Sequence, residues 1–324
     1  MGFLSRLRDA IAGAVKTFSS HASSVLKSVK TSGSPLSDRL LSDALRLAEI
    51  PSPTPNEEQR AAFVVERLTA LGIPSSVDGQ GNITARLTCS DPVESSPILL
   101  FTHLSSPQWH PVESLSRLGP EKAFGAGLGD ALGPATLLSV AEAMLTGGIS
   151  TNKDILLLFA ARPLDDPGCD IFRRLCDDPM YRPLAALGIK GIQLGTIQAR
   201  TMGTYRIEVR VRTDADIHDT DTVPGSAVDA VVAIARTLSG VTWDAEKKTS
   251  CQIRRLEAGT AFGHIPTEGI IDIEMESSDS AVLEMAMKAA LATAESTGKD
   301  AKAKVEASIV GFVQIGRASC RERV

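Results

Sequence analysis

Residues 37–161 alternate between helical and strand-type hydrophobic patterns. Apolar residues recur at helical spacing over 37–50 and 57–71, and these runs end before Pro51 and at Gly72, so each predicts a helix. Strands are predicted at "NITARL" and "PILLFTH", a Gly-rich loop at "FGAGLGDALG", and a third helix over "PATLLSVAEAML". The following run, "DILLLFAA", is apolar without alternation, which is typical of a strand buried on both faces. We therefore expect an α/β domain over residues 35–196.

The pattern changes after residue 196. Strands of period two are predicted at "TYRIEVRVR", "CQIRRLE" and "IIDIEME", and helices at "PGSAVDAVVAIARTLSG" and "DSAVLEMAMKAALATAES". This β-α-β-β-α-β order predicts a small α+β domain of two layers over residues 197–314, with two helices covering one face of a sheet.

The N-terminal 34 residues have a different character. They carry five basic residues against Asp9 alone, a balance of +4, and residues 1–30 place apolar side chains at helical spacing. Two interpretations remain open for this basic amphipathic helix. It is either a peripheral membrane anchor or partner-docking helix, or an additional helix packed on its own domain.

The last ten residues, "IGRASCRERV", match the translation of a common sequencing adapter. We therefore expect residues 315–324 to be an artefact, and the natural chain to continue beyond Gln314.

Composition narrows the class of protein. The net charge is −5 despite the basic N-terminus, so the main body is acidic and a nucleic-acid partner is not expected. The five cysteines show no CxxC spacing, which suggests neither a zinc ribbon nor a disulfide framework and favours a reducing cytoplasm. With 43% hydrophobic residues and no apolar run long enough to span a bilayer, the chain is expected to be a soluble cytoplasmic protein.

Several segments fall in the order of one family's landmarks. They are "LRLAEIPSPTPNEEQRAAFVVERLTALGI", "GNITARL", "GLGDALGPATLLSVAEAM", "IHDTDTVPGSAVDAV" and "AGTAFGHIPTEGIIDIEMES". Over residues 38–314 the chain resembles the M20 zinc exopeptidases and amidohydrolases, above all peptidase T and its relatives.

The resemblance implies a zinc-exopeptidase-like mixed sheet with helices on both faces, plus an inserted α+β two-layer lid/dimerisation domain. It also implies two zinc ions, hydrolysis of small peptides or N-acyl amino acids, and a homodimer formed through the lid. Zinc in such sites is held by His and carboxylate side chains and activates a water molecule.

His103 ends its strand where the family's His-x-Asp histidine sits, so the resemblance makes it the first zinc-ligand candidate. The Asp expected two residues later is Ser105 here, so we expect the imidazole to lack its orienting partner, a loss that typically lowers metal affinity or activity about 10- to 100-fold. The alternative is a strand-end histidine bonded to the backbone.

Asp130 is the candidate for the bridging metal ligand. Alignment on Gly133 puts Gly129 in the ligand position, whereas a shift of one residue puts Asp130 there, and only the second register keeps a ligand. The alternative is an ordinary turn or N-cap Asp.

The family's Glu-Glu pair, general base and then ligand, should follow "DILLLFAA". An ungapped alignment places Pro163 and Leu164 there, but a lengthening by two residues makes Asp165 the base and Asp166 the metal ligand. Each Asp is one methylene shorter than Glu, and a displacement of about 1 Å can cost on the order of 100-fold in rate. The alternative for "DDPG" is a solvated turn.

In the lid, His218 matches the histidine that binds an oxyanion or a carboxylate in the partner's active site. Gly263 replaces the lid Asn, Glu276 falls where an Arg is expected, and His264 is expected to pack in the same loop. "ALGIKGIQLG" has no acidic residue for the next ligand, and the final histidine ligand would lie beyond residue 314.

At most one partial metal site is therefore expected. Three hypotheses remain: a zinc peptidase or amidase with an eroded metal site and little activity, a non-catalytic dimeric binding or regulatory protein on the same fold, or a different metal- or ligand-binding role for these residues.

Overall fold

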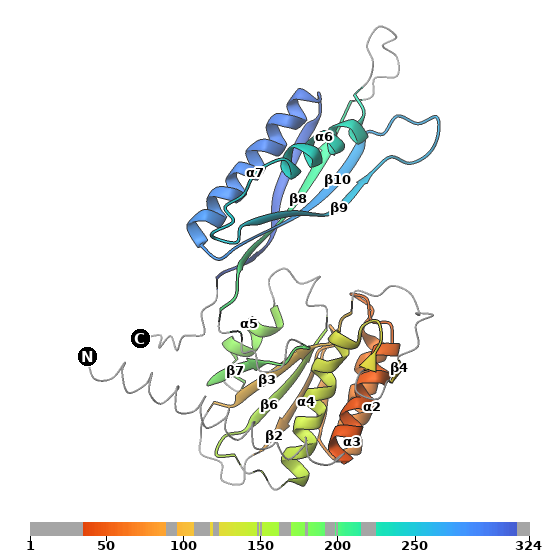
Figure 1. The fold of residues 1–324 in the computed structure, drawn as a ribbon, viewed down its shortest axis with the longest axis vertical. Coiled ribbons are helices and arrows are strands. Elements are labelled where there is room, and N and C mark those ends of the chain that lie inside the picture. The colour runs from red at the N-terminus through yellow and green to blue at the C-terminus, as the bar shows by residue number, and fades with distance from the viewer. Residues whose placement is uncertain are drawn as a thin grey trace, which may run out of the picture. The chain divides into compact units, whose positions relative to one another are not determined.

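The computed structural model describes residues 35–88, 96–106, 117–118, 123–147, 149, 151–161, 170–178, 181–191, 198, 200–214 and 225–315. These fall into two compact units (Figure 1), the first within Met1–Asp165 and Ile171–Gln193, the second within Asp166–Asp170 and Leu194–Val324. The N-terminal helix expected over residues 1–30, the site candidates Asp165, Asp166 and His218, and residues 316–324 lie outside the described residues. The domain limits 35–196 and 197–314 stay predictions.

The first unit is built on a mixed sheet with the strand order β1-β2-β6-β3-β7. Its strands are β1 (Ser75–Val77), β2 (Ile83–Leu87), β6 (Ile155–Ala160), β3 (Ile98–His103) and β7 (Ala185–Gly188). Strand β3 is parallel to β6 and β7, whereas β2 is antiparallel to β6 and β1. All six residues of β6 are buried, as the unalternating apolar run predicts.

Helices cover both faces of this sheet (Figure 1), which confirms the predicted fold class. Helices α2 (Pro35–Glu49), α3 (Glu58–Ala70) and α4 (Leu128–Thr146) pack on the face that carries Leu157 and Phe159. Helix α5 (Asp170–Asp177) packs on the face that carries Leu156 and Leu158. Each fully buried Leu or Phe contributes roughly 2 kcal/mol of transfer free energy, so β6 stabilises both layers. A two-stranded pair, β4 (Arg117–Leu118) and β5 (Ala123–Phe124), completes the unit.

A partly buried ionic network joins the three helices that share a face. The Arg67 Nε of α3 donates to the Asp43 Oδ2 of α2 at 3.0 Å, and Arg67 Nη2 lies 3.8 Å from the Glu142 Oε2 of α4. Glu142 also pairs with Arg39 of α2 at 2.7 Å. Asp43 and Glu142 are both buried, and buried carboxylates are stable only when they are paired.

The second unit is an antiparallel sheet in the order β11-β8-β10-β9, covered on one face by two helices. Its elements follow the chain as β8 (Gly203–Arg212), α6 (Ala227–Ser239), β9 (Ser250–Ala258), β10 (Glu268–Ser277), α7 (Ser280–Asp300) and β11 (Lys304–Val313). This β-α-β-β-α-β order confirms the prediction. Apolar side chains of β8 and β10 point at the helices, and the alternate positions carry ion pairs such as Arg206–Glu274 at 3.1 Å and Arg255–Asp272 at 2.8 Å.

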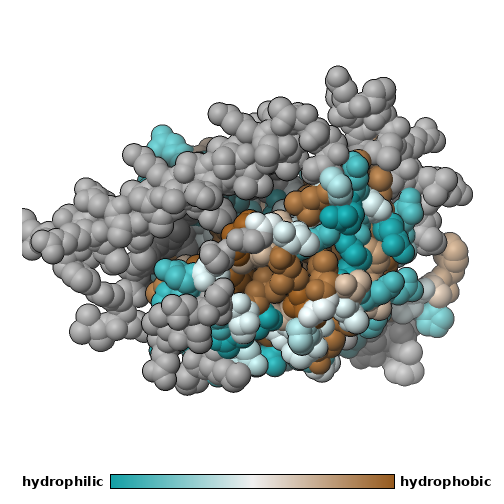
Figure 2. Space-filling model, turned by 90° about the horizontal axis from the view of Figure 1, so that it is seen from below, coloured by the Kyte–Doolittle hydropathy of each residue, from teal (hydrophilic) through white to brown (hydrophobic). Residues whose placement is uncertain are grey.

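The surface seen from below shows a hydrophobic area bordered by hydrophilic residues (Figure 2). Exposed large apolar side chains of the first unit are Val77, Phe124, Leu145, Ile149, Leu184 and Leu187. Among the helices that the structure describes, none has both the length and the apolar character needed to cross a membrane.

Candidate metal centre

His103 is the last residue of β3, and its ring is held by the backbone that follows the strand. The Nδ1 atom lies 3.0 Å from the carbonyl oxygen of Ser105 and 3.4 Å from the Ser105 hydroxyl. A carbonyl oxygen can only accept, so Nδ1 carries the proton and donates it, which leaves Nε2 of the neutral ring free to bind a metal. The structure shows the arrangement that the alternative describes, a strand-end histidine bonded to the backbone, and this bond also gives the imidazole an orienting partner in place of the absent Asp.

The surroundings keep the imidazole neutral. Burial lowers the pKa of His103 below its ordinary value of 6.5, and the Lys190 and Arg60 cations lower it further. The Asp130 carboxylate and the Ser105 carbonyl act in the opposite direction, but burial is the largest contribution. A neutral imidazole is the form that a metal ligand requires.

Asp130 lies in the first turn of α4, close enough to His103 to influence its charge. Its Oδ2 atom accepts a hydrogen bond from the Ser106 hydroxyl at 3.4 Å.

The Gly-rich loop expected before α4 is largely part of the helix. Gly127, with φ of 72°, forms the N-cap, and the helix begins at Leu128. A positive φ of this kind is easily adopted only by glycine.

Glycine also sets how closely α4 approaches the sheet. A Cβ atom added at Gly133 would lie 2.3 Å from the Thr102 Oγ1 of β3 and 3.0 Å from the Ile189 carbonyl oxygen. A Cβ atom at Gly191 would lie 2.0 Å from the Gly129 carbonyl oxygen. The start of α4 therefore fits against β3 and the segment after β7 only because these positions lack side chains, and this contact brings Asp130 to the end of β3.

Arg60 is a further charged residue at this place, and sequence analysis missed it. It belongs to α3, has no exposed surface, and donates from Nε to the Ile50 carbonyl and from Nη1 to the Leu104 carbonyl, both at 3.1 Å. Burial lowers the pKa of Arg60 to about 10, while the Asp130 carboxylate raises it, so the guanidinium stays charged at neutral pH. The sequence could have indicated this residue, because Arg60 stands at helical spacing with Val64 and Leu68 and is therefore a cation on the apolar side of the helix.

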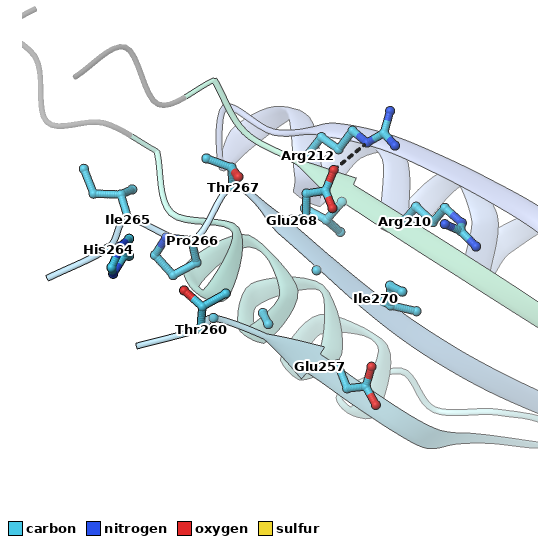
Figure 3. Close-up of a pocket in the computed structure, with 14 residues that line it drawn as sticks. Arg210, Arg212, Glu257, Thr260, His264, Ile265, Pro266, Thr267, Glu268 and Ile270 are labelled. Atoms are coloured by element: carbon cyan, nitrogen blue, oxygen red, sulfur yellow. Dashed lines mark ion pairs between the residues drawn. The ribbon is translucent and has the colours of Figure 1, made fainter. Parts of the chain in front are cut away.

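Three of the lid residues, Gly263, His264 and Glu276, are described, and the loop after β9 borders a pocket of about 480 Å³ (Figure 3). His264 lines this pocket together with Thr260, and Gly263 of the same loop has φ of 84°. The pocket carries charges of both signs, and Arg212 pairs with Glu268 at 3.5 Å. Glu276 stands in β10 opposite Thr204.

The described residues bring together two of the five predicted site residues, His103 and Asp130. In the ranges that the structure covers, no three His, Cys, Asp or Glu side chains gather as a metal site. A neutral imidazole and a carboxylate are ligand types that zinc takes in proteins, and Asp130 is near enough to act on the charge of His103. Two cations among the described residues, Lys190 and the buried Arg60, oppose a positive charge at His103.

Comparison with known proteins gives the class of the fold. No family model matches the chain. Over 155 residues it is 29% identical to a protein of Pyrococcus abyssi named as a LysW-lysine/LysW-ornithine hydrolase; the match covers 46% of this chain and only 40% of that relative.

Solved structures match over more of the chain. A tripeptidase from Staphylococcus aureus matches with a TM-score of 0.63 and 18% identity, covering 87% of this chain and 78% of its own. A dinuclear metal-binding peptidase of the M20 family from Bacillus subtilis matches with a TM-score of 0.55 and 13% identity, covering 86% and 76%. The chain has the fold of the M20 peptidases and amidohydrolases, and the predicted resemblance is confirmed at the level of the fold.

Proposed function

We propose that the protein is a metal-dependent hydrolase of the M20 type, acting on small peptides or N-acyl amino acids with low turnover. The observation that carries this proposal is the position of His103 at the carboxyl end of the parallel strand β3, where Asp130 of α4 acts on its charge and accepts from Ser106. In α/β folds, this end of a parallel sheet is where ligands bind. The support that Ser105 gives to the imidazole leaves Nε2 available as a ligand atom.

The remaining roles are proposed from the resemblance. Asp166 would be a further metal ligand, Asp165 would accept the proton of the attacking water, and His218 would bind a substrate carboxylate or oxyanion. A bound zinc ion would polarise the scissile carbonyl and acidify the water. The shorter Asp side chains and the missing acidic ligand near residue 190 explain why low turnover is proposed.

The test is hydrolysis of a panel of dipeptides, tripeptides and N-acyl amino acids by the zinc-loaded protein. His103→Ala and Asp130→Asn should abolish turnover, and Asp165→Asn should lower kcat with metal content retained. As a control, His264→Ala changes a histidine in the second unit's loop and should retain metal. Hydrolysis that survives His103→Ala, or a metal-loaded protein without any hydrolysis, would refute the proposal.

A second candidate function is non-catalytic binding or regulation by a dimer on the same fold. The charge of Arg60 beside Asp130 favours this candidate, since it opposes a catalytic metal. Strand β11 is an edge of its sheet and exposes Ile309, Val310, Phe312 and Val313, which suits pairing with a second copy through the lid. Sedimentation of the wild type and of Val310→Lys tests this, and a monomeric wild type would refute the dimer.

The cytoplasmic location and the peripheral membrane contact of residues 1–30 also remain proposals. Flotation with vesicles that contain anionic lipid tests the second, because a basic amphipathic helix binds such surfaces in a salt-dependent way. A protein that remains unbound at low salt would exclude membrane contact.

A further inference from the structure

Arg60 places a permanent positive charge inside the first unit, next to the proposed metal ligands. The side chain has no exposed surface, and two of its N–H groups are used by main-chain carbonyls of Ile50 and Leu104. Leu104 directly follows His103, so the bond to its carbonyl ties the guanidinium to the end of β3. Arg60 Nη2 has no hydrogen-bond partner in the described part of the chain.

A buried guanidinium requires a compensating negative charge. The desolvation of an ion costs several kcal/mol, and neutral carbonyl acceptors offset only part of that cost. Asp130 is the carboxylate that acts on Arg60, and its Oδ2 also accepts from Ser106. Asp130 is thus the carboxylate available to balance the charge of Arg60, although the two side chains form no direct hydrogen bond among the described contacts.

His103 lies within the field of three charges, with Asp130 attracting and Lys190 and Arg60 repelling a proton or a cation at the ring. Lys190 is exposed, so solvent screens its charge more than that of the buried Arg60. A divalent ion bound by His103 and Asp130 would draw on the carboxylate that acts on Arg60 and would be repelled by the guanidinium. In a buried site this repulsion is only weakly screened by salt.

We propose that Arg60 is a fixed cation that holds Asp130 as its counter-ion and lowers the affinity of the His103–Asp130 pair for divalent metal. The proposal rests on the ligand roles proposed above for His103 and Asp130. Arg60 is then a residue that sets metal occupancy without touching the metal. A lysine at this position would keep the charge, and an uncharged side chain would release the carboxylate.

The experiment is a titration of the metal-free full chain with Co²⁺, followed by the visible absorbance of the bound ion. Wild type, Arg60→Met, Arg60→Gln and Arg60→Lys are compared. Since one neighbouring charge typically changes a site's proton affinity by about tenfold or more, both neutral variants should bind Co²⁺ at least about tenfold more tightly than wild type, and Arg60→Lys should remain near wild type. Equal or weaker binding by both neutral variants would overturn the proposal.

A double-mutant cycle tests the interaction between Arg60 and Asp130 without metal and covers the case in which a neutral variant folds poorly. In the presence of a chelator, Asp130→Asn should lower the thermal unfolding midpoint strongly when Arg60 is present and only slightly in the Arg60→Met background. Equal shifts in the two backgrounds would mean that Asp130 is not the counter-ion, and the proposal would fail.

The outcomes also separate this proposal from the proposed function. Metal binding that requires His103 but is unaffected by Arg60→Met would refute only the proposed effect of Arg60 on metal affinity. An absence of Co²⁺ binding in the wild type and in both neutral variants would refute both proposals.

Discussion

The Nδ1 atom of His103 lies 3.0 Å from the backbone carbonyl oxygen of Ser105, the residue that replaces the Asp expected at this position. A main-chain acceptor thereby takes over the orienting role of a side-chain carboxylate, although it contributes no negative charge. The ring is held in the tautomer that a metal ligand needs, in a site that is less negative than the resemblance implies.

Removal of the Ser105 hydroxyl should therefore have little effect. In Ser105→Ala the carbonyl remains, and it is the backbone bond of Ser105 that acts on the pKa of His103. We expect the His103 pKa, measured by NMR titration and assigned with His103→Gln, to change by less than about half a unit. A decrease of a full unit would show that the hydroxyl, 3.4 Å away, is the true partner.

The stability of the metal-free protein should fall as the solution becomes more acidic, partly because of His103. Its pKa is lower in the folded protein than the ordinary value of 6.5, so the unfolded chain binds the proton more readily. Above pH 6.5, protonation of His103 does not change the free energy of unfolding. As the pH falls from 6.5 through the folded pKa, the unfolded chain takes up the proton more readily, so the free energy of unfolding decreases. Urea unfolding of wild type and His103→Gln should give a steeper loss of stability in the wild type. Identical slopes would contradict this prediction.

Gly133 should not tolerate a side chain. In Gly133→Ala the new Cβ atom would lie 2.3 Å from Thr102 Oγ1 and 3.0 Å from a carbonyl oxygen, so α4 must shift away from β3. Overpacking of this kind costs about 1–3 kcal/mol, and the shift should also move Asp130 away from His103.

Gly129 is the matched control for that substitution. It lies in the same helix, and a Cβ atom there meets nothing within 4 Å. Gly129→Ala should be neutral or should stabilise the fold by up to about 1 kcal/mol, because Ala favours a helix over Gly. Chemical denaturation measures both variants, and equal effects would mean that the approach of α4 to β3 does not require Gly133.

The network around Arg67 should be costly to break. Arg67→Met leaves the buried Asp43 carboxylate without its 3.0 Å partner. It also removes one of the two arginines that balance the negative charge of Glu142. Removal of one partner from a buried pair costs about 3–5 kcal/mol, and because Arg67 keeps 21% side-chain exposure we expect the lower end of that range.

The exposed pair between Lys288 and Glu284 of α7 provides the control, since it lies at 2.7 Å in water-accessible positions. Lys288→Met should leave stability almost unchanged, because solvent screens such a pair. A similar loss in both variants would show that the effect of Arg67→Met does not come from buried charge.

The sequence by itself determined the kind and order of the elements. The period-two strands of the second unit, the unalternating β6 and the helical stripes of α2, α3, α6 and α7 are local patterns, and each was expected at nearly its observed position. Local periodicity reports which side of an element meets the core. It therefore also indicated that β6 is buried on both faces, as observed. The helices on both faces of the first sheet were implied by the resemblance, and those on one face of the second by the order of its elements.

Tertiary structure alone decided what surrounds the candidate ligands. The close approach of α4 to β3 depends on the fit of Gly133 against Thr102, a contact between residues far apart in the chain. The carbonyl of Ser105 became a partner of His103 only through the path of the backbone after β3. Arg60 lies at the end of β3 because α3 directs its apolar side toward that end, and Arg60 is on this side of the helix. Charge and hydrogen bonding at a site depend on distances between segments, and hydrophobic periodicity contains no information on those distances.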